Sequence, residues 1–157
     1  MRKKIKDLQL VVIDSLIASP DEVANIDPNT IATVRLLTDT DATKLYGEDA
    51  KGGVLICETK PYARKKYIKF FRKVSHQYDS LYSTTNSDST FQYILNKKIK
   101  TENFEGTLSL INDDLFISLE IVTADDLKNK YGITGKSYGI LIYSKKPADL
   151  YDKKGEF

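Results

Sequence analysis

Residues 31–60 read IATVRLLTDTDATKLYGEDAKGGVLICETK, with an apolar run at each end and a polar middle. The β-branched and aliphatic residues of Ile31–Leu37 and Val54–Thr59 favour strands. Residues 38–41 offer helix-capping side chains, and a glycine follows the later Tyr, so we expect a short helix between the strands. The turn and cap residues of this stretch are Asp39, Asp41, Tyr46, Gly47, Gly52 and Gly53.

The segment before this stretch predicts further short elements. Residues 8–17 are apolar and β-branched, with a break at Asp14-Ser15 that predicts a strand or a short hairpin. Asp27-Pro28-Asn29 is a helix-start pattern, because Asp caps helices and Pro fits the first helical position. The helix must be brief, since the strand pattern begins directly after it.

The second half of the chain repeats this order. The segment at residues 34–38 aligns with residues 119–123, and Tyr46-Gly47 aligns with Tyr131-Gly132. With one extra residue in the second copy, Gly53 aligns with Gly139 and the apolar run that follows each is matched. Both copies end in Lys-Pro, and residues 11–14 have a counterpart in residues 93–96. This ordered recurrence favours an internal duplication over chance similarity between two strand–helix units.

The segment between the two copies has a helical period. Aromatic and apolar residues recur at three- and four-residue spacing from Tyr67 to Leu81, which predicts one face of a helix of about five turns. Residues 83–90 are rich in Ser, Thr and Asn and predict a loop. Basic residues cover much of the remaining helix surface and form a possible anion-binding face: Arg64, Lys65, Lys66, Lys69, Arg72 and Lys73.

These patterns predict an α+β protein of two β-α-β-α-β repeats with small mixed sheets, joined by one longer amphipathic helix. The expected boundaries are residues 1–60 for the first repeat, 61–90 for the helix and loop, 91–147 for the second repeat and 148–157 for a frayed tail. The two sheets either lie side by side or pack on the joining helix.

The amino-acid composition restricts the classes of partner that this protein is expected to bind. The chain has 157 residues, of which 41% are apolar and 29% charged, as in a globular domain. The 24 basic residues nearly balance the 22 acidic residues, leaving a net charge of +2. Nucleic acid is therefore an unlikely partner, because a dedicated binder needs a surplus of cations.

The sequence leaves two cellular compartments as alternatives. Cys57 is the single cysteine, which excludes an intramolecular disulfide without deciding the compartment. Polar residues interrupt the segment after the basic start, so we identify no signal peptide. No segment approaches the ~20 apolar residues of a membrane span. We expect a periplasmic or cell-envelope protein if a leader has been removed, and a cytoplasmic protein otherwise.

The order of motifs in the first copy resembles the plug domain of TonB-dependent outer-membrane receptors, especially the nutrient-uptake receptors of the Bacteroidetes. In those plugs, a strand, a Pro-initiated short helix, a strand, a helix ending in Tyr-Gly and a glycine-entered strand ending in Thr-Lys follow one another. The segments that carry the resemblance are residues 12–14 (VID), 26–28 (IDP), Ile31–Leu37, 39–47 (DTDATKLYG) and 52–60 (GGVLICETK).

The resemblance implies an envelope interaction module, with departures that affect function. Ser15 replaces the usual turn glycine, and residues 48–51 differ from the loop typical of the family. A receptor barrel of about 22 strands needs ~220 residues, more than this chain has. We therefore expect a binding module without a pore and without a cofactor, whose partner is an envelope protein or a small ligand.

Residues with catalytic chemistry are isolated in the sequence. His76 is either a metal ligand or general base or a surface residue, and we favour the last because no second histidine accompanies it. Cys57 in a strand favours a structural thiol over a nucleophile. Residues 39–41 favour helix capping over calcium binding, and Gly135-Lys136-Ser137 lacks the earlier glycine of a phosphate loop. We expect no enzyme; the rival hypothesis is a binder of nucleic acid or anionic surfaces through residues 60–73.

Overall fold

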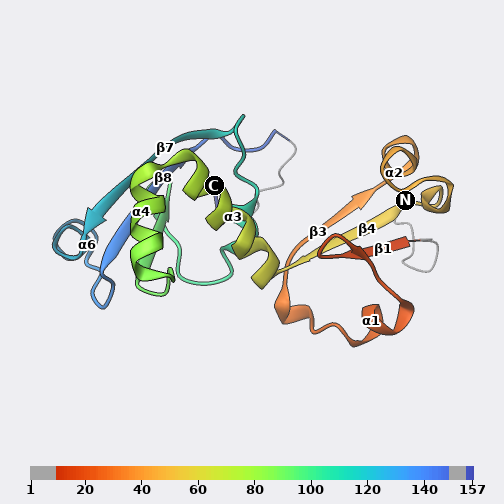
Figure 1. Ribbon diagram of the computed structural model, residues 1–157, viewed down its shortest axis with the longest axis horizontal. Coiled ribbons are helices and arrows are strands. Elements are labelled where there is room, and N and C mark those ends of the chain that lie inside the picture. Colours follow the sequence, from red (N-terminus) through yellow and green to blue (C-terminus); the bar gives the residue numbers. More distant parts are fainter. Residues whose placement is uncertain (1–9, 149–154) are drawn as a thin grey trace. The chain divides into compact units, whose positions relative to one another are not determined.

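The computed structural model describes residues 10–148 and 155–157. The chain divides into two compact units, Met1–Ala63 and Arg64–Phe157. Each unit contains helices and one four-stranded mixed sheet (Figure 1). This confirms the predicted α+β class with two small mixed sheets, and the two sheets are separate.

The first unit begins with a β-hairpin and ends in the strand that leads into the long helix. Its sheet has the order β2-β1-β4-β3, with β1 parallel to β4 and antiparallel pairing elsewhere. Its elements are β1 (Leu10–Ile13), β2 (Leu16–Ile17), α1 (Pro20–Asn25), η2 (Pro28–Thr30), β3 (Ile31–Leu37), α2 (Asp39–Tyr46), η3 (Glu48–Ala50) and β4 (Val54–Thr59).

Local chemistry accounts for these bounds. Asp27 caps η2 by accepting a hydrogen bond from the N–H of Asn29, and Pro28 is its first residue, as predicted. Gly47 ends α2 with a φ of 77°, a backbone conformation that glycine adopts without strain. Helix α1 was not predicted from the sequence, although Ser19 and Glu22 form a complete capping box at its start. In contrast, Thr38 makes no side-chain capping bond to α2.

The second unit has the same sheet topology. Its strands have the order β6-β5-β8-β7, with β5 parallel to β8. Its elements are α4 (His76–Thr85), β5 (Phe91–Leu95), β6 (Lys98–Ile99), α5 (Glu105–Ser109), β7 (Phe116–Thr123), α6 (Ala124–Tyr131) and β8 (Tyr138–Ser144), preceded by α3 (Lys60–Val74), which begins in the first unit.

The structure corrects three expectations in this half. The single joining helix is two helices, because Ser75 interrupts α3 and caps α4 by accepting from the N–H of Tyr78 at 3.1 Å. Helix α4 continues to Thr85, three residues into the expected loop. The tail is not wholly frayed: residues 149–154 lie outside the described part, but Phe157 is only 8% exposed and packs in the core.

The two sheets share one strand register. Leu36 lies opposite Leu55 in the first sheet, and Ile121 lies opposite Ile140 in the second. The edge strands β3 and β7 each carry a register shift near their start, between Ile31 and Thr33 in β3 and between Phe116 and Ser118 in β7. The sequence alignment is wrong in one detail.

The sequence alignment of the two copies placed one extra residue in the second copy, and the structure does not contain it. Val54 lies opposite Leu37, and Gly139 lies opposite Val122, so Gly139 corresponds to Val54 rather than to Gly53. A Cβ on Gly139 would stand 2.6 Å from side-chain atoms of Leu127 and Val122. Glycine at this position therefore lets α6 pack closely against the sheet.

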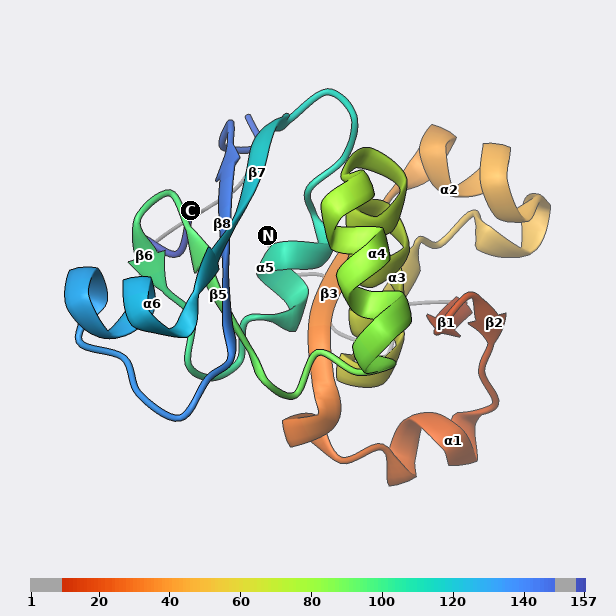
Figure 2. The same ribbon diagram turned by 60° about the vertical axis from the view of Figure 1, so that its left-hand side comes forward.

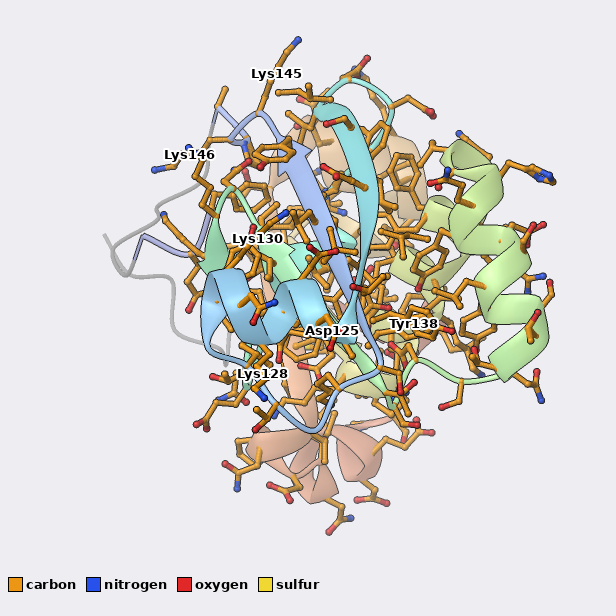
Figure 3. The ribbon with its side chains drawn as sticks, turned by 90° about the vertical axis from the view of Figure 1, so that its left-hand side faces the viewer. Asp125, Lys128, Lys130, Tyr138, Lys145 and Lys146 are labelled. Atoms are coloured by element: carbon orange, nitrogen blue, oxygen red, sulfur yellow. The ribbon has the colours of Figure 1, made fainter. Side chains whose placement is uncertain are left out.

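Helices cover both faces of the second sheet. Helix α6 lies on one side of β7 and β8, and α3 and α4 lie on the other (Figure 2). Lys128 and Lys130 project from α6 into solvent, whereas Tyr138 lies on the side of the sheet that faces α4 (Figure 3). On that side Tyr67, Phe71 and Tyr78 pack against the strands in the larger core cluster.

Candidate functional site

The first sheet has one covered face and one open face. Residues opposite each other on neighbouring strands point to the same side. Leu37 and Val54 point to the covered side, where Val54 packs with Ala42 of α2. The other side, called the open face, consists of Val11, Ile13, Val34, Leu36, Leu55 and Cys57.

Every side chain of the open face is apolar or weakly polar, and none is buried. Val34 is 60% exposed and Leu36 is 45% exposed. Ile13 also lines a depression of about 370 Å³ beside the hairpin, together with Leu16, Ile17, Ala18, Glu22, Asn25 and Ile26. The apolar surface therefore extends from the sheet to the hairpin.

The equivalent face of the second sheet is closed. Leu119 lies opposite Ile142, as Val34 lies opposite Cys57, and Ile121 lies opposite Ile140. Ile140 and Ile142 are fully buried, and the aromatic side chains of α3 and α4 pack over this face together with α5. One fold, present twice, thus has a helix-covered face in one copy and an exposed apolar face in the other.

Cys57 lies on the open face and is partly exposed. Burial raises the pKa of its thiol, and the negative charge of Asp14 raises it further. A nucleophilic cysteine needs the opposite environment, one that lowers the thiol pKa. This strand position therefore favours the protonated thiol.

The basic face predicted on α3 is partly neutralised. Arg64 pairs with Asp88, Arg72 with Asp79 at 2.5 Å, and Lys73 with Asp113 at 2.7 Å. The other predicted members, Lys65, Lys66 and Lys69, are exposed.

Arg72 and Lys73 also lie over the rings of Tyr82 and Phe70. A hollow lined by Lys65, Ile68, Lys69, Arg72 and Tyr82 remains beside the exposed lysines. Three of the six predicted cations, Arg64, Arg72 and Lys73, are thus engaged in ion pairs.

The motif residues of the two repeats hold turns and helix ends. Asp14 is in the hairpin turn, Pro28 begins η2 and Gly132 ends α6 in the left-handed conformation. Asp41 is exposed, and nothing is described of the side chain of Asp39. These positions are distributed over two units and do not form one site. The remaining members are Tyr46, Gly47, Gly52, Gly53, Tyr131 and Gly139.

The isolated residues with catalytic chemistry stay apart from one another. His76 is the exposed first residue of α4. Among the described residues there is no group of three or more His, Cys, Asp and Glu side chains that could hold a metal ion. Lys136 donates to the carbonyl oxygen of Ser89 at 2.9 Å, and its loop leads into a strand rather than a helix. In the described ranges 10–148 and 155–157, no helix is long and apolar enough to cross a membrane.

Comparisons with known proteins give only partial matches. No family model and no solved structure matches the chain. The chain is 34% identical over 71 residues to the spike glycoprotein of Bat coronavirus HKU4, a match that covers 45% of this chain and 5% of the spike. The spike glycoprotein of Bat coronavirus 133/2005 matches with the same identity and coverage. Such short matches assign neither a family nor a function.

Proposed function

We propose that this chain is a non-catalytic interaction module of the cell envelope, related to the plug domain of TonB-dependent receptors. In this proposal, the open face of the first unit receives the apolar side of a helix from a partner protein. The motif order in residues 12–60 supports the relationship to plugs. The open face itself supports the binding role.

One observation carries the binding role: Val34 and Leu36 are exposed where Leu119 and Ile121 are partly buried and pack against the core of the second unit. Because the two sheets share a register, the open face presents its side chains at the same strand positions as the face that helices cover in the second unit. Full burial of an aliphatic side chain of this size contributes about 1.5–3 kcal/mol. The second unit covers its equivalent face with amphipathic helices that carry aromatic side chains, such as α3. The proposed partner segment is a helix of the same kind.

Site-specific photocrosslinking in the native cells tests this function. A photoreactive residue at position 36 should yield a discrete adduct with an amphipathic helical segment of another protein, and Val34→Lys should abolish that adduct. A photoreactive residue at the exposed Ile117 of β7 is the matched control, because it is 59% exposed but lies outside the open face. Identical adducts from positions 36 and 117, or an adduct of position 36 with a second copy of this chain, would contradict the proposal.

The rival function, binding of nucleic acid or an anionic surface through α3, rests on the hollow beside Lys65 and Lys69. Binding of this kind weakens steeply with salt, because counterions are released. Titration of the full chain with DNA, RNA and anionic vesicles at low and high salt distinguishes it. Absence of binding at low salt would exclude the rival and leave the open-face proposal untouched.

A further inference from the structure

The second unit contains a cavity of about 320 Å³ that belongs neither to the open face nor to the basic face. Its walls come from α3, β5, the loop before β5 and the start of α5. Phe91 and Phe104 give it apolar surface, and Gln92 and Thr101 add polar groups. The charged residues that line it are Arg64, Asp88, Lys100, Glu105 and Lys136.

Asp88 forms a buried, hydrogen-bonded part of this wall. Its side chain is 4% exposed and accepts hydrogen bonds from the hydroxyls of Tyr67 at 3.1 Å and Tyr93 at 3.0 Å, besides its ion pair with Arg64. The hydroxyls of Tyr93 and Tyr78 are also 2.7 Å apart. Burial and the nearby carboxylate raise the pKa of Tyr67, so its hydroxyl keeps its proton and remains a donor. Asp88 therefore shapes the cavity rather than offering an acceptor.

Glu105 differs from Asp88. Its Oε2 atom is inaccessible to solvent and has no hydrogen-bond partner within the described chain. A buried carboxylate oxygen without a donor destabilises a fold, so an acceptor of this kind calls for a functional explanation. Glu105 also lines the cavity, so its carboxylate is an anionic group of the wall that lacks a donor for one of its oxygens within the described chain.

Cationic groups line the same cavity. The ammonium of Lys136 donates one hydrogen bond to the carbonyl of Ser89 at 2.9 Å, and the ammonium of Lys100 donates to the carbonyl of Glu156. An ammonium carries three donors, so Lys136 retains donors for an anion. The cavity thus combines an anionic acceptor, a cationic donor and aromatic surface.

We propose that this cavity binds a small zwitterion of the amino-acid type. The ammonium group of the ligand donates to the carboxylate of Glu105, the ligand's carboxylate accepts from Lys136, and its hydrocarbon part lies against Phe91 and Phe104. A free amino acid supplies an ammonium, a carboxylate and a hydrocarbon side chain, and it is small enough for a cavity of about 320 Å³. The proposal concerns a different unit and a different class of ligand from the open face, so either can fail alone.

Calorimetric titration of the full chain with matched ligands tests the proposal. Alanine, leucine and phenylalanine supply a size series, while 4-methylpentanoate and 3-methylbutylamine are leucine without its ammonium and without its carboxylate. We expect at least one amino acid to bind, and leucine to bind about tenfold or more tightly than either truncated analogue. Equal affinity for all three leucine-related ligands, or no saturable binding by any amino acid, would overturn the proposal.

Two variants assign the binding to Glu105. Glu105→Gln should weaken amino-acid binding about tenfold or more, because the carboxylate that pairs with the ammonium is lost, and should not weaken the binding of 4-methylpentanoate, which has no ammonium. Glu102→Gln is the control, since Glu102 is an exposed carboxylate near Glu105 that does not line the cavity. Equal amino-acid affinity in Glu105→Gln and the parent would refute the assignment.

Discussion

The carboxylate of Asp14 accepts two hydrogen bonds from Thr59, one from its backbone N–H and one from its hydroxyl, each 2.7 Å long. This contact joins the hairpin turn to the end of β4. In the second unit Asn96 occupies the same turn position and exchanges two 3.0 Å bonds with the backbone of Ser144. The two copies thus keep one turn-to-strand contact and change its chemistry from a carboxylate to an amide.

Replacing Asp14 with Asn should reproduce the geometry of the turn contact in the second copy and remove the negative charge of Asp14. Asn tolerates the positive φ of this turn, 50° at Asp14, so backbone strain should not change. We expect the free energy of unfolding to fall by about 1 kcal/mol, because a charged acceptor is lost. Urea denaturation measures it, with the exposed Asp49→Asn as the control. A loss equal to that of the control would mean that the charge of Asp14 adds no stability to the contact.

The same variant should change the reactivity of Cys57. The charge of Asp14 contributes to the raised pKa of this thiol, so its removal should lower the pKa and increase the thiolate fraction at a given pH. The pH profile of the reaction rate with a thiol reagent should therefore shift to lower pH in Asp14→Asn. An unchanged profile would show that burial alone controls the thiol.

Equivalent substitutions on the two sheets should have opposite consequences for stability. Val34→Lys with Leu36→Lys places charges on the open face and should change the free energy of unfolding by about 0.5 kcal/mol or less per site. Leu119→Lys with Ile121→Lys places the same charges beneath the aromatic helices and should cost about 3 kcal/mol or more, or prevent folding. Chemical denaturation of both double variants provides the comparison; equal losses would show that the first face is also covered in the folded chain.

The sequence predicted the elements that local chemistry determines. The bounds of β3 and β4 follow from turn residues and strand-forming runs, and the duplication was visible in Tyr46-Gly47 and Tyr131-Gly132. The break at Ser75 was missed because the apolar spacing continues across it, from Val74 to Tyr78, so the periodicity carries no sign of two helices. The extended backbone of Ser75 and its capping bond to Tyr78 reveal the break in the structure.

The sites were less predictable than the elements. Strands β4 and β8 both alternate apolar residues onto two faces, and only the position of helices from distant segments decides which face is covered. Asp88 lies in a Ser/Thr-rich segment that predicts a solvated loop, yet its side chain is buried by contacts with α3 and β5. Glu105 looks like an ordinary first-turn carboxylate. No local pattern marks either residue as part of a cavity wall.

Glu105 also gives a prediction that separates a ligand-binding role from a structural one. Because its Oε2 atom is buried without a donor in the described chain, replacement by Leu removes an uncompensated polar group and keeps a similar side-chain volume. We expect Glu105→Leu to raise the free energy of unfolding of the unliganded chain by about 1–3 kcal/mol, as urea denaturation would measure. Glu102→Leu is the control and should change stability by about 0.5 kcal/mol or less.

The direction of the change in Glu105→Leu is the informative result. Replacing a residue that supports the fold lowers the free energy of unfolding. Replacing a residue that is retained for a ligand raises the free energy of unfolding, as is common at binding sites. Excess amino acid should then stabilise the parent chain and leave Glu105→Leu unaffected, because a ligand stabilises only the state that binds it. A destabilised Glu105→Leu would indicate that the carboxylate supports the fold, and would remove the structural basis for the proposed amino-acid site.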